Sequence, residues 1–177
     1  MLLLIAAFAS LLALCQADCG YPNGTDKALN WWPGSATANV KFSNVKTLDI
    51  NGNPEYPISL KQPIYIGFHV DNEQGEMTAG NLLMSITISE YGGFFGCSWS
   101  EIPTFGLLTN LDACSKGIPC PVEKGQTDIT AKLDFTPFES IISLLKNDAP
   151  YQLQITLNDK KTNTYANIYA QARAVTK

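Results

Sequence analysis

Apolar and polar residues alternate one by one along several short stretches of this chain. The alternation is clearest at residues 151–157 and recurs at 64–70 and 82–88. In an extended strand successive side chains point to opposite faces, so each stretch predicts a strand with one buried and one exposed face. Such strands fold by pairing into sheets that cover each other's apolar faces.

Further segments predict strands by composition, and turn residues separate them. They lie at 39–50, around 96–100, at 127–135 and at 165–175. Clusters of Asn, Gly, Pro and Asp, for example at 51–54, provide turns between neighbouring strands. About seven strands joined in this way are typical of an all-β, immunoglobulin-like antiparallel β-sandwich, which is the fold class we expect.

Residues 136–147 have helical periodicity instead. Thr136 is suited to cap a helix and Pro137 to occupy its first position. The apolar residues of the segment share one helical face: Phe138, Ile141, Ile142 and Leu145. We expect one short amphipathic helix, which either closes an end of the sandwich or borders the entrance to a ligand site.

Residues 1–17 predict a secretory signal peptide. Residues 2–14 are apolar apart from Ser10, and small residues at Cys15 and Ala17 stand where a signal peptidase reads. The apolar run is shorter than the ~20 residues that span a bilayer. A buried core helix is the alternative interpretation. With cleavage after Ala17, residues 18–177 form one domain.

Four cysteines follow this cleavage point, and an even number fits two disulfides. Cys114 and Cys120 enclose a short loop containing a Gly and a Pro, which favours their pairing. Cys19 is then left to pair with Cys97, although four cysteines allow three pairings. Zinc is the alternative, but no C-x-x-C spacing occurs and His69 is the only histidine, so we expect no metal.

Asn23 begins the only N-x-S/T sequon with a permitted middle residue, Asn23-Gly24-Thr25. It lies in a polar, turn-rich stretch, and we expect it to be a glycosylation site. Together with the signal peptide and the cysteines, the sequon predicts a secreted protein, either extracellular or in the lysosomal lumen.

Residues that could carry catalysis are few. A Ser/His/Asp or Cys/His site would need His69, and no G-x-S-x-G, H-E-x-x-H, P-loop or G-x-G-x-x-G motif occurs. The carboxylate pairs Asp71 with Glu73, and Asp134 with Glu139, stand at turns or element ends, where solvated charges are usual. The net charge of −4, with no basic run, does not favour nucleic acid as a partner. We expect no enzymatic activity.

Alanines dominate the inward face of the last predicted strand: Ala166, Ile168, Ala170, Ala172 and Ala174. Small inward residues let two sheets close tightly or leave space for a ligand, because sheets normally pack ~10 Å apart with large side chains interdigitating. From this strand alone we expect close packing.

The segment before Cys114 carries more large apolar residues than one short strand can bury: Phe94, Phe95, Trp99, Ile102, Phe105, Leu107, Leu108 and Leu111. This excess is consistent with the mouth of an apolar cavity, the kind of site that holds acyl chains or sterols. Trp31 and Trp32 either join that rim or seal the sandwich.

A bridge between Cys114 and Cys120 would close a short loop, which we call the stapled loop. The segment 114–127 that contains it resembles a loop of the ML lipid-recognition family; its sequence is Cys-Ser-Lys-Gly-Ile-Pro-Cys-Pro-Val-Glu-Lys-Gly-Gln-Thr. In that family Cys-x5-Cys-Pro is followed by a Lys and a strand-opening Thr. The order of strands around the loop is similar over nearly all of 18–177. The staple is most similar to the Niemann-Pick type C sterol-carrier branch, whereas 92–97 and 136–150 are more like the ganglioside-activator branch.

This resemblance implies two sheets that splay apart around an apolar ligand, the opposite of close packing. It also implies a monomer without a cofactor that binds and transfers lipid, most of all a sterol, through transient contact with a membrane or acceptor protein. The alternatives are a glycolipid or phospholipid presenter and an extracellular lipid-sensing module.

The resemblance assigns nine residues to the ligand cavity: Phe68, Met84, Ile86, Phe105, Leu107, Leu133, Phe135, Ile155 and Ile168. Phe135 is the strongest assignment, because it follows Lys132-Leu133 as a pocket residue follows Lys-Leu in the sterol carrier. The chain departs from the family in one respect. The usual bridge from the N-terminal cysteine ends in the last strand, which has no cysteine here, so the bridge from Cys19 to Cys97 stands as a prediction.

Overall fold

The computed structural model describes residues 19–36, 40–93 and 96–177. The expected signal peptide and the proposed mouth residues Phe94 and Phe95 lie outside these ranges. The strands of the described part are β1 (Asn30–Ala36), β2 (Val40–Leu48), β3 (Ile58–Ser59), β4 (Ile64–Asn72), β5 (Leu82–Tyr91), β6 (Trp99–Glu101), β7 (Leu111–Asp112), β8 (Gly125–Leu133), β9 (Ala149–Asp159) and β10 (Thr164–Val175).

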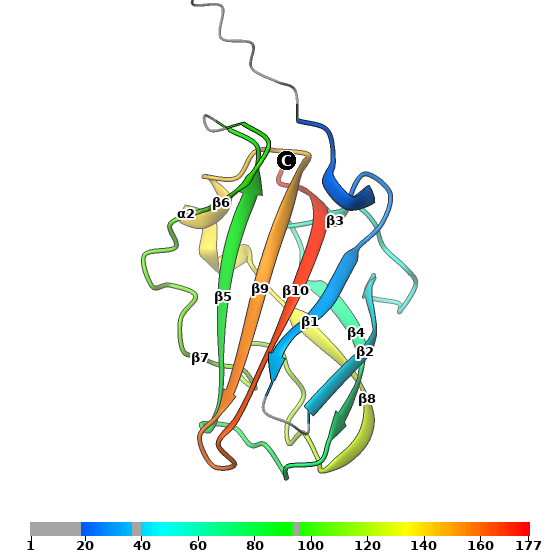
Figure 1. Ribbon diagram of the computed structural model, residues 1–177, viewed down its shortest axis with the longest axis vertical. Coiled ribbons are helices and arrows are strands. Elements are labelled where there is room, and N and C mark those ends of the chain that lie inside the picture. The colour runs from blue at the N-terminus through cyan, green and yellow to red at the C-terminus, as the bar shows by residue number, and fades with distance from the viewer. Residues whose placement is uncertain (1–18, 37–39, 94–95) are drawn as a thin grey trace, which may run out of the picture.

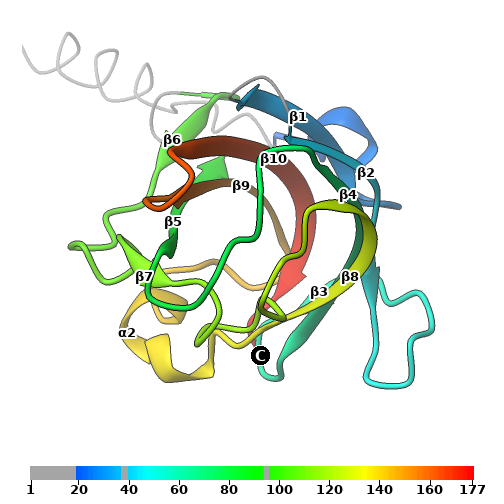
Figure 2. The same ribbon diagram turned by 90° about the horizontal axis from the view of Figure 1, so that it is seen from below.

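These strands form two sheets that face each other (Figure 1). The larger sheet has the order β1-β10-β9-β5-β6, and the smaller sheet has the order β2-β4-β8. Strand β7 pairs with β5, and the short β3 adds a parallel pair to β10, whereas the other ladders are antiparallel. Seen along the strands, the two sheets curve around a common interior (Figure 2). The predicted all-β sandwich is confirmed.

All seven predicted strands are present, but β1, β3 and β7 were not predicted. In β1, Pro33 and Gly34 interrupt the alternation that marks a strand, yet an edge strand tolerates Pro because its N–H need not join a ladder. β1 pairs only with β10, and its Trp32 stacks on Tyr169 with ring centroids 5.3 Å apart. β3 and β7 have two residues each, which is too short for a periodic signal.

The helix is shorter than the 136–147 that the sequence predicts. A 3-10 turn (η3, Thr136–Phe138) leads into α2 (Glu139–Ile142), and tight turns follow. Thr136 does not cap the helix, because its backbone N–H and its hydroxyl both donate to Asp134 Oδ1, at 3.0 and 2.7 Å. No helix of the described residues is long and apolar enough to cross a membrane.

Both predicted disulfides are present, between Cys19 and Cys97 and between Cys114 and Cys120. The first joins residues 78 positions apart and ties the N-terminal segment to the connection between β5 and β6. The second closes the loop between β7 and β8.

Candidate functional site: an apolar cavity between the sheets

A cavity of about 110 Å³ lies between the two sheets. The smaller sheet contributes inward side chains such as Phe42, Ile66 and Phe68, and the larger sheet contributes Leu153 and Leu157 among others. The period-2 alternation of the strands places these residues inward, because their neighbours in sequence point to the opposite face. The cavity is therefore a gap within the sandwich core.

The lining side chains offer no free hydrogen-bond donor. Every lining side chain is a hydrocarbon apart from the Met84 thioether and the Tyr151 hydroxyl. That hydroxyl already donates to the backbone oxygen of Lys146 at 2.8 Å. Burial raises the pKa of Tyr151 to about 12, so the phenol stays neutral. The cavity can hold a guest only by apolar burial and shape.

The small alanine side chains of β10 leave room for the cavity. Ile168, Ala170, Ala172 and Ala174 all line the cavity, as the predicted inward face requires. The close packing that this strand alone suggested is wrong for its C-terminal half, since the opposing sheet does not fill the volume above these methyl groups. Small side chains permit either outcome, and the distance between the sheets decides which one occurs.

Six of the nine residues assigned by resemblance are brought together at this cavity: Phe68, Met84, Leu133, Phe135, Ile155 and Ile168. Ile86 is buried on the same face of β5, with 5% of its surface exposed, but it packs in the core and is not part of the lining.

Phe105 and Leu107 lie outside the cavity, with 84% and 46% of their surfaces exposed. They stand on the connection between β6 and β7, where Leu107 N–H donates to the Thr104 carbonyl in a turn whose tip faces away from the core. Ile102 and Leu108 of the same connection are the buried residues. Composition identified the segment as apolar but did not show which of its residues face inward.

Several lining residues were not assigned from the sequence. Ile142 and Leu145 come from α2 and the turn after it, and the apolar face of the predicted helix was the signal that could have identified them. Leu29, Ile58 and Leu60 also contribute, from segments that have no clear periodicity. The helix and the turn after it therefore contribute to the wall of the cavity.

The stapled loop forms one wall. Ile118, between the two bridged cysteines, is buried and lines the cavity. Lys132 N–H donates to the Gly117 carbonyl at 2.9 Å, which docks the loop on β8. Gly117 has a φ of +113°, and a Cβ there would lie 1.7 Å from the Lys132 carbonyl oxygen, so only glycine fits. The sequence predicted the staple but not this close approach.

Asp112 holds the start of the same loop. One carboxylate oxygen accepts from the backbone N–H groups of Cys114 and Ser115, and the other accepts from Gly80. These hydrogen bonds hold the pKa of Asp112 below its ordinary value. The loop is thus tied to its surroundings by a carboxylate, a disulfide and a backbone pair.

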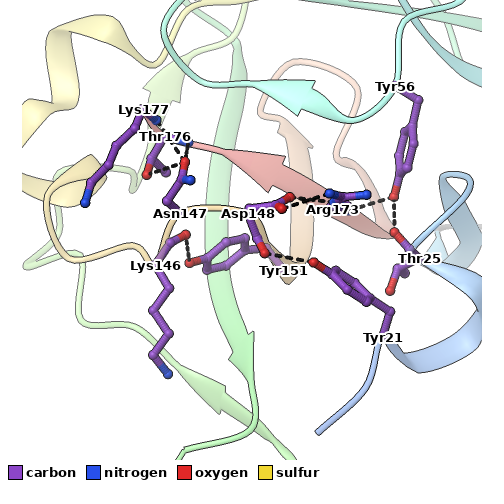
Figure 3. Close-up of polar contacts among 10 residues, drawn as sticks. All are labelled: Tyr21, Thr25, Tyr56, Lys146, Asn147, Asp148, Tyr151, Arg173, Thr176 and Lys177. Carbon is purple, nitrogen blue, oxygen red and sulfur yellow. Dashed lines mark hydrogen bonds and ion pairs between the residues drawn. The ribbon is translucent and has the colours of Figure 1, made fainter. Parts of the chain in front are cut away.

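A polar network links the N-terminal segment to β10 next to Tyr151 (Figure 3). Arg173 of β10 makes a two-pronged ion pair with Asp148, with Nη2 donating to Oδ2 at 2.8 Å. The Tyr21 hydroxyl donates to the Asp148 carbonyl at 2.9 Å, and its ring lies 5.4 Å from the Arg173 guanidinium. The Arg173 backbone N–H donates to the Tyr56 hydroxyl at 2.7 Å. These contacts join four segments, those of Tyr21, Tyr56, Asp148 and Arg173, at one end of the sandwich.

The ion pair survives mild acid. Hydrogen bonding to Arg173 holds the pKa of Asp148 below its ordinary value, so the carboxylate remains ionised at the pH of an acidic organelle. Arg173 is charged at any such pH.

His69 lies on the outer face of the smaller sheet, as predicted. Its Nδ1 is 2.9 Å from Asp128 Oδ1, which comes from the neighbouring strand β8. In the part of the chain that the structure describes, no hydroxyl or thiol is hydrogen-bonded to His69. The described residues also contain no group of three His, Cys, Asp or Glu side chains suited to hold a metal.

No family model matches the sequence, and neither does any of the curated proteins compared with it. Among solved structures, the chain resembles a Niemann-Pick type C2 protein from Japanese carpenter ant, with a TM-score of 0.42 and 10% identity. The match covers 77% of this chain and 93% of that chain. A likeness this distant concerns the arrangement of strands and says nothing about a ligand.

Proposed function

We propose that the protein binds a lipid between its two sheets and transfers it, without catalysing a reaction. The observation that carries this proposal is the cavity, whose lining offers only hydrocarbon and a thioether to a guest. Burial contributes on the order of 25 cal/mol per Å² of apolar surface removed from water. For a guest of sterol size this amounts to several kcal/mol, enough for binding without a single hydrogen bond.

A lipid would have to enlarge the cavity. An engineered apolar cavity of ~150 Å³ in another protein admits benzene, so 110 Å³ provides room for a small ring and not for a sterol. The two sheets belong to separate hydrogen-bonded ladders. Moving them apart therefore costs side-chain contacts that an apolar guest replaces, and it does not break the β2-β4-β8 ladder.

A sterol is our preferred ligand because the stapled loop resembles that of the ML family's sterol-carrier branch. The polar part of any lipid would have to remain outside the cavity, since the lining side chains have no donor for it. We further propose a secreted monomer, extracellular or in the lysosomal lumen, that meets a membrane or an acceptor protein only during transfer. The two disulfides support an oxidising compartment.

The test is the lipid content of the secreted protein. Mass spectrometry of the co-purifying lipids should identify a bound species, and the delipidated protein should bind a fluorescent sterol more tightly than a fluorescent phospholipid. Tighter binding of the phospholipid would support the presenter alternative. A native protein that carries no lipid, and that binds neither probe after delipidation, would rule out the proposal.

A further inference from the structure

On the three central strands of the larger sheet, the outer face has one charged side chain, Arg173 near the end of β10, and this side chain is paired with Asp148. Twelve neighbouring outward positions on β5, β9 and β10 are all uncharged: Leu83, Ser85, Thr87, Ser89, Gln152, Gln154, Thr156, Asn158, Tyr165, Asn167, Tyr169 and Gln171. Protein surfaces are roughly 25–35% charged, so a face of this size would ordinarily carry about three or four charges. The outer face of the smaller sheet does carry them: Lys41, Lys46, Asp71, Asp128 and Lys132.

Most of this face is open, although Asn167 and Gln171 are buried. Figure 1 views it from outside, with β5, β9 and β10 side by side and no described helix or loop in front of them. Thr87, Gln154 and Thr156 are each half-buried in the sheet. Across the described residues, none of these three side chains forms a hydrogen bond, so their hydroxyl and amide groups are available to an external partner.

The strand register places an aromatic pair next to these groups. Thr87, Gln154 and Tyr169 follow one another across the sheet, and Trp32 of β1 comes next and stacks on Tyr169. Sugars present hydroxyl groups that both donate and accept hydrogen bonds, together with apolar C–H faces. Uncharged amides and hydroxyls beside aromatic rings match both properties.

The sequon Asn23 stands at the edge of this face. Asn23 is exposed, and its Nδ2, the atom to which an N-linked glycan attaches, donates to Gln171 Oε1 at 2.7 Å. Gln171 in turn donates to Gln152 at 2.8 Å, so a chain of amides leads from Asn23 onto β9. A glycosylated amide keeps one hydrogen and can keep the bond to Gln171. Gln154 is only two residues further along β9 than Gln152, or ~7 Å.

We propose that an N-linked glycan on Asn23 folds back and packs on this face, over Gln154, Tyr169 and Trp32. The proposal rests on glycosylation of Asn23 and is independent of what the cavity binds. The occupant is the chain's own glycan, because its attachment atom already lies against β10. The absence of charges around Gln154 and Tyr169 follows, since a charged side chain there would keep its water and hold a neutral sugar away.

The experiment uses secreted protein that carries a high-mannose glycan, before and after trimming to a single N-acetylglucosamine by an endoglycosidase. Mass spectrometry of the intact protein should show an occupied Asn23. Trimming should shift the NMR signals of the Gln154 side-chain amide and the Trp32 indole, and should leave that of Gln126, on the smaller sheet, unchanged. The melting temperature should fall by about 2–4 °C.

Two variants separate this contact from a general effect of glycosylation. Gln154→Ala should reduce the melting-temperature difference between intact and trimmed protein, whereas the control Gln126→Ala should preserve it. An unoccupied Asn23, or an occupied one whose trimming shifts neither reporter, would overturn the proposal. Dimerisation of the protein through this face would also overturn the proposal. The same holds if the NMR signals of Gln154 and Trp32 shift only when free glycan is added. Lipid binding, measured on the same samples, tests the cavity separately.

Discussion

Replacing Ala172 by Leu tests whether the cavity is truly empty space in the core. Ala172 lies on β10, is buried and lines the cavity. Leucine adds three carbon atoms, and burying each contributes about 0.8 kcal/mol, so filling the cavity should raise the free energy of unfolding of the lipid-free protein by up to about 2 kcal/mol. In a well-packed core the same change would instead lower the free energy of unfolding by about 1–3 kcal/mol.

The same strand provides a matched control. Ala166 is also inward and buried, but it borders a second space of only about 20 Å³. Ala166→Leu should therefore lower the free energy of unfolding by about 1–3 kcal/mol. Urea denaturation of the two delipidated variants measures both changes, and the opposite signs are the expected result.

Ligand binding gives the second measurement. Leucine at Ala172 occupies volume that a lipid needs, so the dissociation constant for a fluorescent sterol should rise about tenfold or more, a loss of about 1.4 kcal/mol. If both variants destabilise the protein equally, no empty volume lies above Ala172. If the Ala172 variant binds the sterol unchanged, the sterol binds elsewhere.

Two further predictions concern the ion pair of Asp148 with Arg173 and the stapled loop. Asp148 has a lowered folded-state pKa, so its ion pair with Arg173 should contribute stability above the ordinary value of 3.8 and lose it as the pH falls through the lower folded-state pKa. Denaturation of the wild type and Asp148→Asn should therefore differ at pH 5–7 and converge in stronger acid; equal stabilities at pH 5–7 would contradict this role. Gly117→Ala should lower the free energy of unfolding by more than the ~1 kcal/mol expected for the control Gly52→Ala. Both glycines have a positive φ, but only Gly117 lies against the Lys132 carbonyl. Equal melting temperatures for the two variants would refute the proposed close approach.

Much of the site could be predicted where strand periodicity was strong. Phe68, Met84 and Ile155 were placed correctly because alternate residues of a strand must face the same side. Ile142 and Leu145 were within reach of the same reasoning, applied to the helical face. Phe105, which the resemblance assigned to the cavity, lies outside it, because the turn that follows Thr104 decides where its side chain points.

The edge strand β1 shows a different limit. Pro33 and Gly34 weaken any prediction of a strand, yet β10 accepts β1 as its neighbour because the larger sheet would otherwise end there. Likewise, the sequence showed Ala166 to Ala174 as one uniform inward row. Only the assembled sandwich distinguishes Ala166, which borders a small space, from Ala172, which borders the cavity.

The sequence by itself determined the all-β architecture, the inward residues of the strands with clear alternation and the short bridge from Cys114 to Cys120, because each of these follows from local spacing. The tertiary structure alone decided that small inward side chains enclose a cavity, and that the charge-poor outer face of the larger sheet lies next to Asn23. Both depend on how far apart the sheets stand and on which strands become neighbours, and these are set by the contacts of all strands together rather than by any one segment.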